Sequence, residues 1–545
     1  MKHKKILAAF TAVAALTSLA ACGGVKQDAS SSAKDSSTIT IGTTDKVVSI
    51  DPAGSFDNGS YAVEFQIYPF LYAQNYNSSE MSPDIAADGG NWSADGTKFT
   101  VKIKPGLKFA NGHALTAQDV KFTFDRVKKI NDENGPSSLL ANIKSVDAPD
   151  DTTVVFTSSV PNDVTLKQVL SSPAGPIVDH QIYPADKLAT SDEIMKGQGF
   201  AGPYTLSQFK QNESAQFSKN PAYKGLTPAK NKTVQVKYFA DPSNLKMAVQ
   251  QSSVDVASRT LSPTDIQDLQ KSGKVKVVKG PGGEERFIAF NFKIMPYGEK
   301  TSNPDPKKAT AVRHAFADLL DRESIAKRVY KNTTYSPMYS YIPNGLTGHE
   351  DTLKAKYGDG HGKPSLDKAK KTLDEAGVKT PVDLKLEYNS DHYGAASADE
   401  YAAVKSQLES GGLFKVDLQQ TEWDQYNKNR VVTAKSDGAY PVYQAGWFPD
   451  YPDPDDYLSP FFRDGNFVNN GYKNTTMNEL IAKEAGEQDE TKRVEILKQI
   501  QDMAADDLSV IPLLQGSQVA VTAPNIKGVV LDGSFRFRYA SIVKS

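Results

Sequence analysis

The cysteine content places the strongest constraint on this chain. Cys22 is the only cysteine in 545 residues, so no disulfide can form within the chain. Stability therefore has to come from buried apolar side chains. Roughly 500 residues follow Cys22, which is too many for one hydrophobic core and enough for two or three domains. We predict a large protein with several cores.

The first 22 residues have the pattern of an export signal. Lys2, Lys4 and Lys5 precede an apolar run from 6 to 21, which is too short to span a membrane. The run ends in Leu-Ala-Ala-Cys at 19–22, which resembles the bacterial lipobox. The resemblance implies that Cys22 carries a diacylglyceryl group and becomes the first residue of the mature chain. A plain secretory signal with a chance cysteine is the alternative.

Residues 23–37 predict a flexible tether. Ser, Ala, Lys and Asp dominate this stretch, and it has too few apolar side chains to offset the entropy of ordering. Two or three acyl chains hold a protein on a membrane essentially permanently. We expect a lipid-anchored protein on the extracellular face of the cytoplasmic membrane, from a Gram-positive source, with the folded part beginning near Thr38.

Charge excludes two broad classes of function. Lys and Arg number 63 against 65 Asp and Glu, for a formal net charge of -2. Such a balance gives no basic field to attract a phosphate backbone. No second apolar run is long enough to cross a membrane. Nucleic-acid binding and an integral membrane role are therefore not expected.

Strand and helix patterns alternate along the chain and predict a mixed α/β class. Phe99, Val101 and Ile103 alternate with polar residues, as in a half-buried strand. Thr116 and Asp119 then form a capping-box pair ahead of a helix. Further strands are predicted at 153–156, 234–239, 287–292, 382–388 and 414–418, and helical stripes at 312–320, 401–408 and 494–500.

Motifs for catalysis or cofactor binding give little support to an enzyme. Gly197, Gly199 and Gly202 match a dinucleotide-loop spacing, but neither the preceding strand nor the following helix is predicted. His349 and His361 lie in a Gly-rich stretch typical of an exposed loop. No nucleophile elbow, phosphate-binding Gly-Lys-Ser loop or paired-cysteine set occurs. We predict no cofactor, no metal site and no enzymatic activity.

A series of short motifs covers nearly the whole mature chain. In order, they are Ser82 to Ala86, Trp92 to Val101, Gly106 to Phe109, Thr116 to Val120, Gly202 to Tyr204, Asn220 to Tyr223, Val312 to Ala315, Asp321 to Glu323, Gly446 to Pro454, and Leu458 to Pro460. Their order and spacing resemble the peptide-type (family 5) extracellular solute-binding proteins of ABC importers. Most of these motifs are folding signals; Asp321, for example, is a suitable cap for the helix carrying Ile325.

The resemblance implies a large three-domain fold of the periplasmic-binding-protein type. Two α/β lobes joined by a hinge close on a ligand, and an extra domain lies beside the first lobe. Mapped through the motifs, the first lobe comprises residues 38–68, 204–292 and 515–545, the extra domain 69–203, and the second lobe 293–514.

The resemblance also implies a set of ligand contacts. Asp450, after the Gly-Trp pair, corresponds to an aspartate that binds the α-ammonium of a peptide, and Trp447, Trp423 and Tyr451 offer faces for its side chains. For each of them, a turn or a core position is the alternative.

Three more positions follow from the same likeness. Arg430 matches by spacing an arginine that meets acidic groups of the ligand, although Gln444 stands where some relatives have a second basic residue. Asp57 and Asn58, in the polar stretch after Asp51-Pro52, are expected to meet the ligand main chain.

The expected function is peptide capture. A monomer would bind peptides outside the cell and deliver them to the transmembrane subunits of an ABC permease, whose cytoplasmic ATPases supply the energy. The alternatives are the same fold with another polar solute (an oligosaccharide, an opine or a nickel complex), an exported hydrolase, or a surface adhesin or chaperone.

Overall fold

A computed structural model describes residues 38–78, 80–390 and 392–545. The predicted export signal, the lipidation site Cys22 and the tether 23–37 lie outside the described residues. The described residues form one compact unit.

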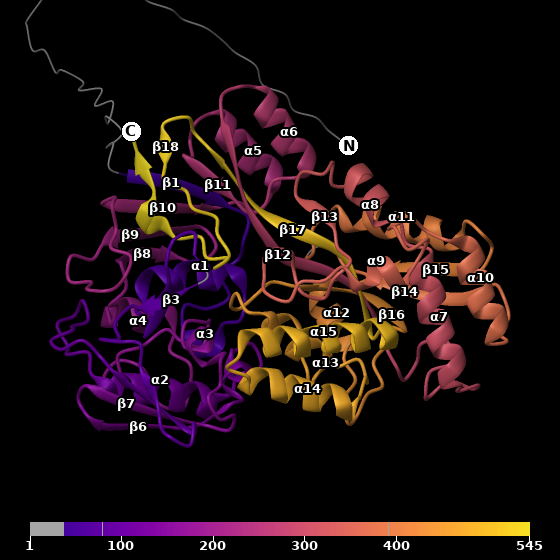
Figure 1. Cartoon of the computed structure of the whole chain (residues 1–545). Helices are drawn as coiled ribbons and strands as arrows, with labels where there is room; N and C mark the ends of the chain where they lie inside the picture. Colours follow the sequence, from indigo (N-terminus) through magenta and orange to yellow (C-terminus); the bar gives the residue numbers. More distant parts are fainter. Residues whose placement is uncertain (1–37, 79, 391) are drawn as a thin grey trace, which may run out of the picture. The chain divides into compact units, whose positions relative to one another are not determined.

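A mixed β-sheet dominates this unit (Figure 1). Within the described residues the strand order is β15 (Phe414–Gln420), β14 (Val382–Tyr388), β16 (Val442–Trp447), β12 (Lys276–Phe290), β17 (Val510–Thr522), β11 (Val256–Ser258), β1 (Thr38–Thr43), β10 (Thr233–Tyr238), β9 (Ser214–Lys219) and β8 (Tyr204–Lys210). A short strand, β13 (Tyr335–Pro337), also pairs with β17.

The long strands β12 and β17 connect two parallel regions of the sheet. β1 runs parallel to β10 and β11 on one side, and β14 runs parallel to β15 and β16 on the other. β12 pairs antiparallel with both β17 and β16. The β12–β17 register shifts between Lys279 and Gly282, between Gly282 and Glu284, and between Arg286 and Phe287. Such irregularities bend a strand pair, so the two parallel regions meet at a bend.

Three smaller sheets accompany it within the described residues. They are β4 (Asn91–Trp92), β5 (Lys98–Lys102), β7 (Thr153–Ser158) and β6 (Ile143–Asp150); β2 (Tyr72–Gln74) with β3 (Met81–Pro83); and β18 (Ile526–Lys527) with β19 (Val543–Lys544). β5 confirms the alternation predicted from the sequence, because Phe99 and Val101 are buried between exposed Lys98 and Lys102.

The described α-helices are α1 (Asn58–Ile67), α2 (Ala117–Ile130), α3 (Leu166–Val169), α4 (Ser191–Gly197), α5 (Pro242–Gln250), α6 (Pro263–Lys271), α7 (Pro306–Asp318), α8 (Arg322–Arg328), α9 (Thr352–Lys356), α10 (Leu366–Glu375), α11 (Ser397–Glu409), α12 (Trp423–Asn429), α13 (Ser459–Phe462), α14 (Thr475–Gly486) and α15 (Glu490–Asp507). Short 3-10 helices are η1 (Pro52–Gly54), η2 (Ser137–Leu140), η3 (Pro454–Tyr457) and η4 (Tyr539–Ser541). No helix in the described part of the chain has the length and apolarity needed to cross a bilayer.

Side chains cap several of these helices as predicted. At α2 the Thr116 side chain accepts from the backbone, and Asp119 accepts from the Thr116 N–H at 2.8 Å, which completes the capping box. Asp321 caps α8 by accepting from the Ser324 N–H at 2.9 Å. Both caps satisfy backbone groups that a helix end leaves unpaired.

The buried apolar side chains of the described residues form four clusters. The first lies among residues 287–514, the second mainly among 53–201, the third joins 39–68 with 178–256 and 520–542, and the fourth lies around α5 and α6. The prediction of several cores is confirmed. The precise lobe boundaries remain a prediction.

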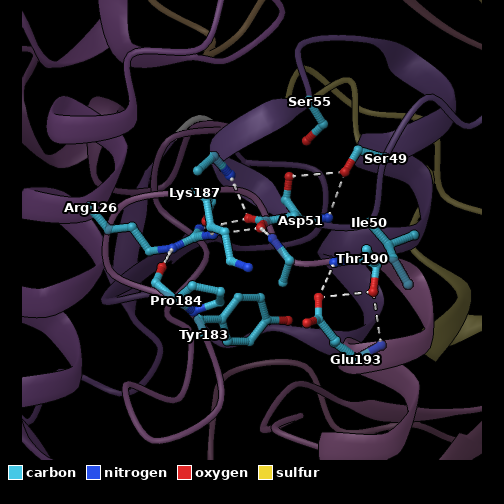
Figure 2. A network of polar contacts seen from close by, with 12 residues as sticks. Ser49, Ile50, Asp51, Ser55, Arg126, Tyr183, Pro184, Lys187, Thr190 and Glu193 are labelled. Atoms are coloured by element: carbon cyan, nitrogen blue, oxygen red, sulfur yellow. Dashed lines mark hydrogen bonds and ion pairs between the residues drawn. The ribbon is translucent and has the colours of Figure 1, made fainter.

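A buried ion pair holds η1 against α2 (Figure 2). Two guanidinium nitrogens of Arg126 donate to the two carboxylate oxygens of Asp51 at 2.7 and 2.6 Å, and both side chains are almost fully buried. Arg126 also donates to the carbonyls of Pro184 and Lys187, and Asp51 accepts from the N–H of Ala189. The Asp51-Pro52 motif is therefore an anchor for three chain segments.

Candidate functional site

Two adjoining cavities lie at the bend of the main sheet. The smaller has a volume of about 60 Å³ and the larger about 110 Å³. They share the lining residues Ser258, Arg259, Phe448, Phe535 and Phe537. The lining comes from strands β1 and β11, helix α1, the loop after β16 and the C-terminal segment, so segments far apart in the sequence build one site.

Asp450 lines the smaller cavity. Its backbone N–H donates to Asp456 Oδ2 at 2.8 Å, which fixes the loop after β16. The Asp450 side chain is buried, and its Oδ2 has no hydrogen-bond partner among the described residues. Burial raises the pKa of this carboxyl well above its usual range. Burial thus favours the neutral carboxyl, and an ammonium group that enters the cavity would favour the ionised form through a charge-assisted hydrogen bond.

Two more carboxyls, those of Asp456 and Glu285, are buried next to the loop that carries Asp450. Asp456 Oδ2 also accepts from the Trp447 indole N–H at 3.3 Å, while its Oδ1 has no partner within the described residues. Glu285, on β12 opposite Trp447, is fully buried with neither carboxyl oxygen hydrogen-bonded to a described residue. Burial, followed by the charge of Asp456, raises the pKa of Glu285 well above its usual range. This concentration of acid favours bound protons or a cationic ligand.

The raised pKa of Glu285 predicts how the free energy of unfolding changes with pH. Because its pKa is raised in the folded protein, the stability it contributes is complete below its unfolded pKa and is lost as the pH rises through the folded pKa. Glu285→Gln removes this loss. The variant should gain about 1.4 kcal/mol of unfolding free energy over the wild type per pH unit in that window.

Urea unfolding at a series of pH values from about 4 to 8 measures this difference. Glu495→Gln, at an exposed position, is the matched control and should follow the wild type. A Glu285→Gln advantage that stays constant across the pH range would contradict a raised pKa.

Arginines provide the positive charges of the smaller cavity. Arg259 Nε donates to Asp45 Oδ1 at 3.1 Å, and its guanidinium carbon lies 5.0 Å from the centre of the Phe448 ring. Arg536 lies over the ring of Phe65 at 4.4 Å. The cavity thus combines cations, carboxyls and aromatic faces.

Local structure explains how α1 and Phe535 reach the cavity. Asp57 Oδ1 caps α1 by accepting from the Ser60 N–H at 2.9 Å, and Asn58, the first residue of α1, lines the cavity. Gly283 on β12 allows Phe535 to approach, since a Cβ at this glycine would lie 1.8 Å from the Phe535 ring. A larger residue at 283 would displace an aromatic wall of the site.

The structure places the predicted site residues in different surroundings. Asp450 and Asn58 line the smaller cavity. Asp57 does not, although its Oδ2 has no partner among the described residues and burial raises its pKa to about 6. Its observed contact is the helix cap, so a ligand role for Asp57 stays a prediction.

The predicted aromatic residues lie outside both cavities. Trp447 packs against Phe461 with ring centres 5.6 Å apart, and Tyr451 donates to Asp455 Oδ2 at 3.1 Å. Trp423 stacks on His392 with ring centres 3.7 Å apart. These contacts are core or interelement packing, and ligand contact by the three aromatics remains a prediction.

Arg430 is also engaged by the protein. Its Nε donates to Asn427 Oδ1 at 3.0 Å and its Nη1 to the Val468 carbonyl at 3.3 Å. The guanidinium lies over the Phe467 ring at 4.5 Å, and the residue lines neither cavity. Arg430 therefore lies outside the candidate site, and its contact with an acidic ligand group stays a prediction.

Several cavity residues escaped the sequence analysis, chiefly Arg259, Glu284, Phe448, Phe535 and Arg536. Phe448 directly follows the Gly-Trp pair, and this neighbourhood could have identified it as a cavity residue. Arg536 lies in an alternation of Phe and Arg at 535–538, which has no feature of a ligand motif by itself.

One group of described residues has the spacing of a metal site. Asp119, Asp179 and His180 place ligand atoms within 4.8 Å of one another. Their oxygens already accept hydrogen bonds: Asp119 Oδ1 from the His180 N–H, and Asp179 Oδ2 from Asn111 Nδ2. His180 Nδ1 lies 2.7 Å from Asp119 Oδ1. The observed contacts account for all three side chains without a metal.

A match to a family model shows which family this chain belongs to. The model for bacterial extracellular solute-binding proteins, family 5 (middle part), matches residues 80–469. The chain belongs to this family. It is also 26% identical over 545 residues to the oligopeptide-binding protein OppA of Bacillus subtilis, with 95% of each chain covered.

Solved structures of family 5 type share the fold. The ABC transporter-associated periplasmic binding protein DppA from Helicobacter pylori, in complex with the peptide STSA, superposes with a TM-score of 0.76 at 19% identity, covering 93% of this chain and 98% of the other. AgaA of Agrobacterium tumefaciens, in complex with agropinic acid, gives a TM-score of 0.73 at 20% identity, with 93% and 99% covered. The predicted fold class, a large mixed α/β fold of the periplasmic-binding-protein type, is confirmed.

Proposed function

We propose that this protein captures peptides outside the cell and delivers them to an ABC permease. The observation that carries the proposal is the buried Asp450 carboxyl, which lines a cavity and has an unpartnered oxygen. A buried charge without a partner costs several kcal/mol, and a peptide α-ammonium would remove that cost through a charge-assisted hydrogen bond. The oligopeptide-binding relative and the peptide-bound structural neighbour add support.

Delivery requires a conformational signal to the permease. We assign the first lobe to 38–68, 204–292 and 515–545, the second to 293–514, and the extra domain to 69–203. Ligand that contacts both lobes shifts the population toward the closed form. The permease subunits recognise the closed form, and their cytoplasmic ATPases drive transport. The binding protein therefore needs no enzymatic activity.

The lipid anchor at Cys22 gives a separate prediction. Cys22→Ser removes the only thiol available for acylation, so the protein should move from the membrane fraction into the medium. Fractionation of cells grown with labelled palmitate measures both changes. Ser31→Ala, in the adjacent stretch, is the control and should leave the label and the membrane location unchanged. Retention of the label by Cys22→Ser would contradict the assignment.

The chemical identity of the molecules bound to the purified protein tests the proposed function. The protein is purified from cells grown in peptide-rich medium and examined by native mass spectrometry, and bound molecules are released by gentle unfolding. Heterogeneous peptides within a narrow length range support the proposal. A single non-peptide solute or a metal would overturn the peptide assignment while leaving the family unchanged.

A second candidate keeps the fold and changes the ligand. The agropinic acid complex of AgaA has a TM-score of 0.73 to this chain, so this architecture also accommodates an opine. An opine receptor would release one homogeneous small molecule in the same mass spectrometry experiment. Peptides with a free and with an acetylated amino terminus would then show no difference in binding.

A further inference from the structure

Two of the four charged residues that line the smaller cavity form no ion pair with a described residue. Asp45, Arg259, Asp450 and Arg536 line it. Asp45 and Arg259 form an ion pair at 3.1 Å and neutralise each other. One carboxyl, at Asp450, and one guanidinium, at Arg536, remain. A ligand complementary to this cavity therefore carries a cation and an anion.

Arg536 is buried, and the two carboxylates whose charges act on it, Asp84 and Asp532, form no ion pair with it. The residue is 8% exposed, and its guanidinium carbon lies 4.4 Å from the Phe65 ring centre and 5.0 Å from that of Phe70. Within the described residues the guanidinium donates no hydrogen bond and forms no ion pair. Burial, and then the charge of Arg538, lower its pKa to about 9. Its donors are therefore available to a group in the cavity.

The neighbouring Arg538 shows what a structural arginine looks like in the same segment. It donates to the Gln74 carbonyl at 2.6 Å and forms an ion pair with Asp532. Asp532 also accepts from the Ser534 N–H at 3.1 Å, which shapes the turn that carries Arg536 to the cavity. Arg538 is thus held by a hydrogen bond and an ion pair, whereas the guanidinium N–H groups of Arg536 have no acceptor among the described residues.

Helix α1 forms part of the wall that the two unpaired charges share. Tyr61 and Phe65 of this helix line the smaller cavity together with Asp450 and Arg536, and Arg536 lies over the Phe65 ring. Tyr61 and Phe65 are one helical turn apart, and their ring centres are separated by 5.8 Å. Because Asp450 and Arg536 line the same small cavity, one ligand can contact both.

We propose that Arg536 binds a carboxylate of the same ligand whose α-ammonium is bound by Asp450. The inference rests on the proposed function. The planar guanidinium suits bidentate binding of a carboxylate, and the aromatic rings of Phe65 and Phe70 hold it in place. The carboxylate is either the C-terminus of a dipeptide or an acidic side chain near the amino terminus of a longer peptide.

Calorimetric titration of the purified wild type and Arg536→Gln with matched peptides tests the proposal. The probes are Ala-Ala against Ala-Ala amide, and Glu-Ala-Ala amide against Gln-Ala-Ala amide. The member of a pair that carries the recognised carboxylate should bind the wild type at least about tenfold more tightly, and Arg536→Gln should abolish that difference. The pair that responds identifies the source of the carboxylate.

Two controls separate the binding role from a role in folding. Arg328→Gln removes an exposed positive charge and should keep the wild-type discrimination. The peptides that lack the recognised carboxylate should bind Arg536→Gln as they bind the wild type. Peptides that bind with equal affinity whether or not they carry the carboxylate would overturn the proposal and leave the peptide receptor standing. Failure of all four peptides to bind would overturn both.

Discussion

Asp450→Asn is expected to lower the affinity for a free-amine peptide by at least about 100-fold. The substitution keeps the size of the side chain and removes the charge that would meet the α-ammonium in the cavity. Stability should not fall, because burial already disfavours the ionised carboxyl in the folded protein. Calorimetric titration with one peptide, alongside thermal unfolding of the same samples, measures both quantities.

A nearby exposed carboxylate provides the control for Asp450. Asp464→Asn also removes one negative charge from the region after β16, but at a solvent-exposed position. This variant should bind as the wild type does. If Asp450→Asn and Asp464→Asn both retain wild-type affinity, the α-ammonium role of Asp450 is wrong.

Arg126→Met should cost about 3–5 kcal/mol of unfolding free energy, because it leaves the Asp51 carboxylate buried without its cation. The side chain also donates to the Pro184 and Lys187 carbonyls, which would lose their donors. Urea unfolding followed by circular dichroism measures the loss. Peptide affinity at low temperature, where the variant is still folded, should change little because neither residue lines either of the two cavities of the candidate site.

A double substitution distinguishes loss of the ion pair from loss of packing. Asp51→Asn in the Arg126→Met background removes the uncompensated charge and should recover part of the stability. Recovery stays partial because Asp51 also accepts from the N–H groups of Ala53 and Ala189. Arg328→Met, at an exposed position, should have little effect. A loss below about 1 kcal/mol for Arg126→Met would contradict the anchoring role of the pair.

Local signals in the sequence predicted many elements of the fold correctly. The capping box at Thr116 and Asp119, the alternation of β5 and the Asp321 cap all appear in the structure. These features depend on side chains within a few residues of one another. Their physics is contained in a short window of sequence.

The cavity could not be derived in the same way. Asn58, Arg259, Asp450 and Arg536 meet only through the pairing of β1, β11 and β17 and the path of the C-terminal segment. The availability of Arg536 depends on its forming no ion pair with any described residue, and no local sequence pattern encodes this. Asp450 was accessible only through the likeness of its surrounding motif to a family.

Residue type alone did not separate ligand contacts from core positions. Trp447 and Arg430 are large side chains suited to ligand binding, yet the same properties allow Trp447 to pack on Phe461 and Arg430 to bind the Val468 carbonyl. A tryptophan face and a guanidinium fork serve a core as well as a ligand. Their surroundings in the fold decide between these uses.

The central claim is that a buried carboxylate selects peptides by their free amino terminus. Titration of the wild-type protein with a cargo peptide and with its N-acetylated counterpart tests this most directly. We predict binding of the free peptide and loss of binding on acetylation, because acetylation removes the ammonium and leaves Asp450 without a partner. Equal affinity for the two peptides would contradict the account.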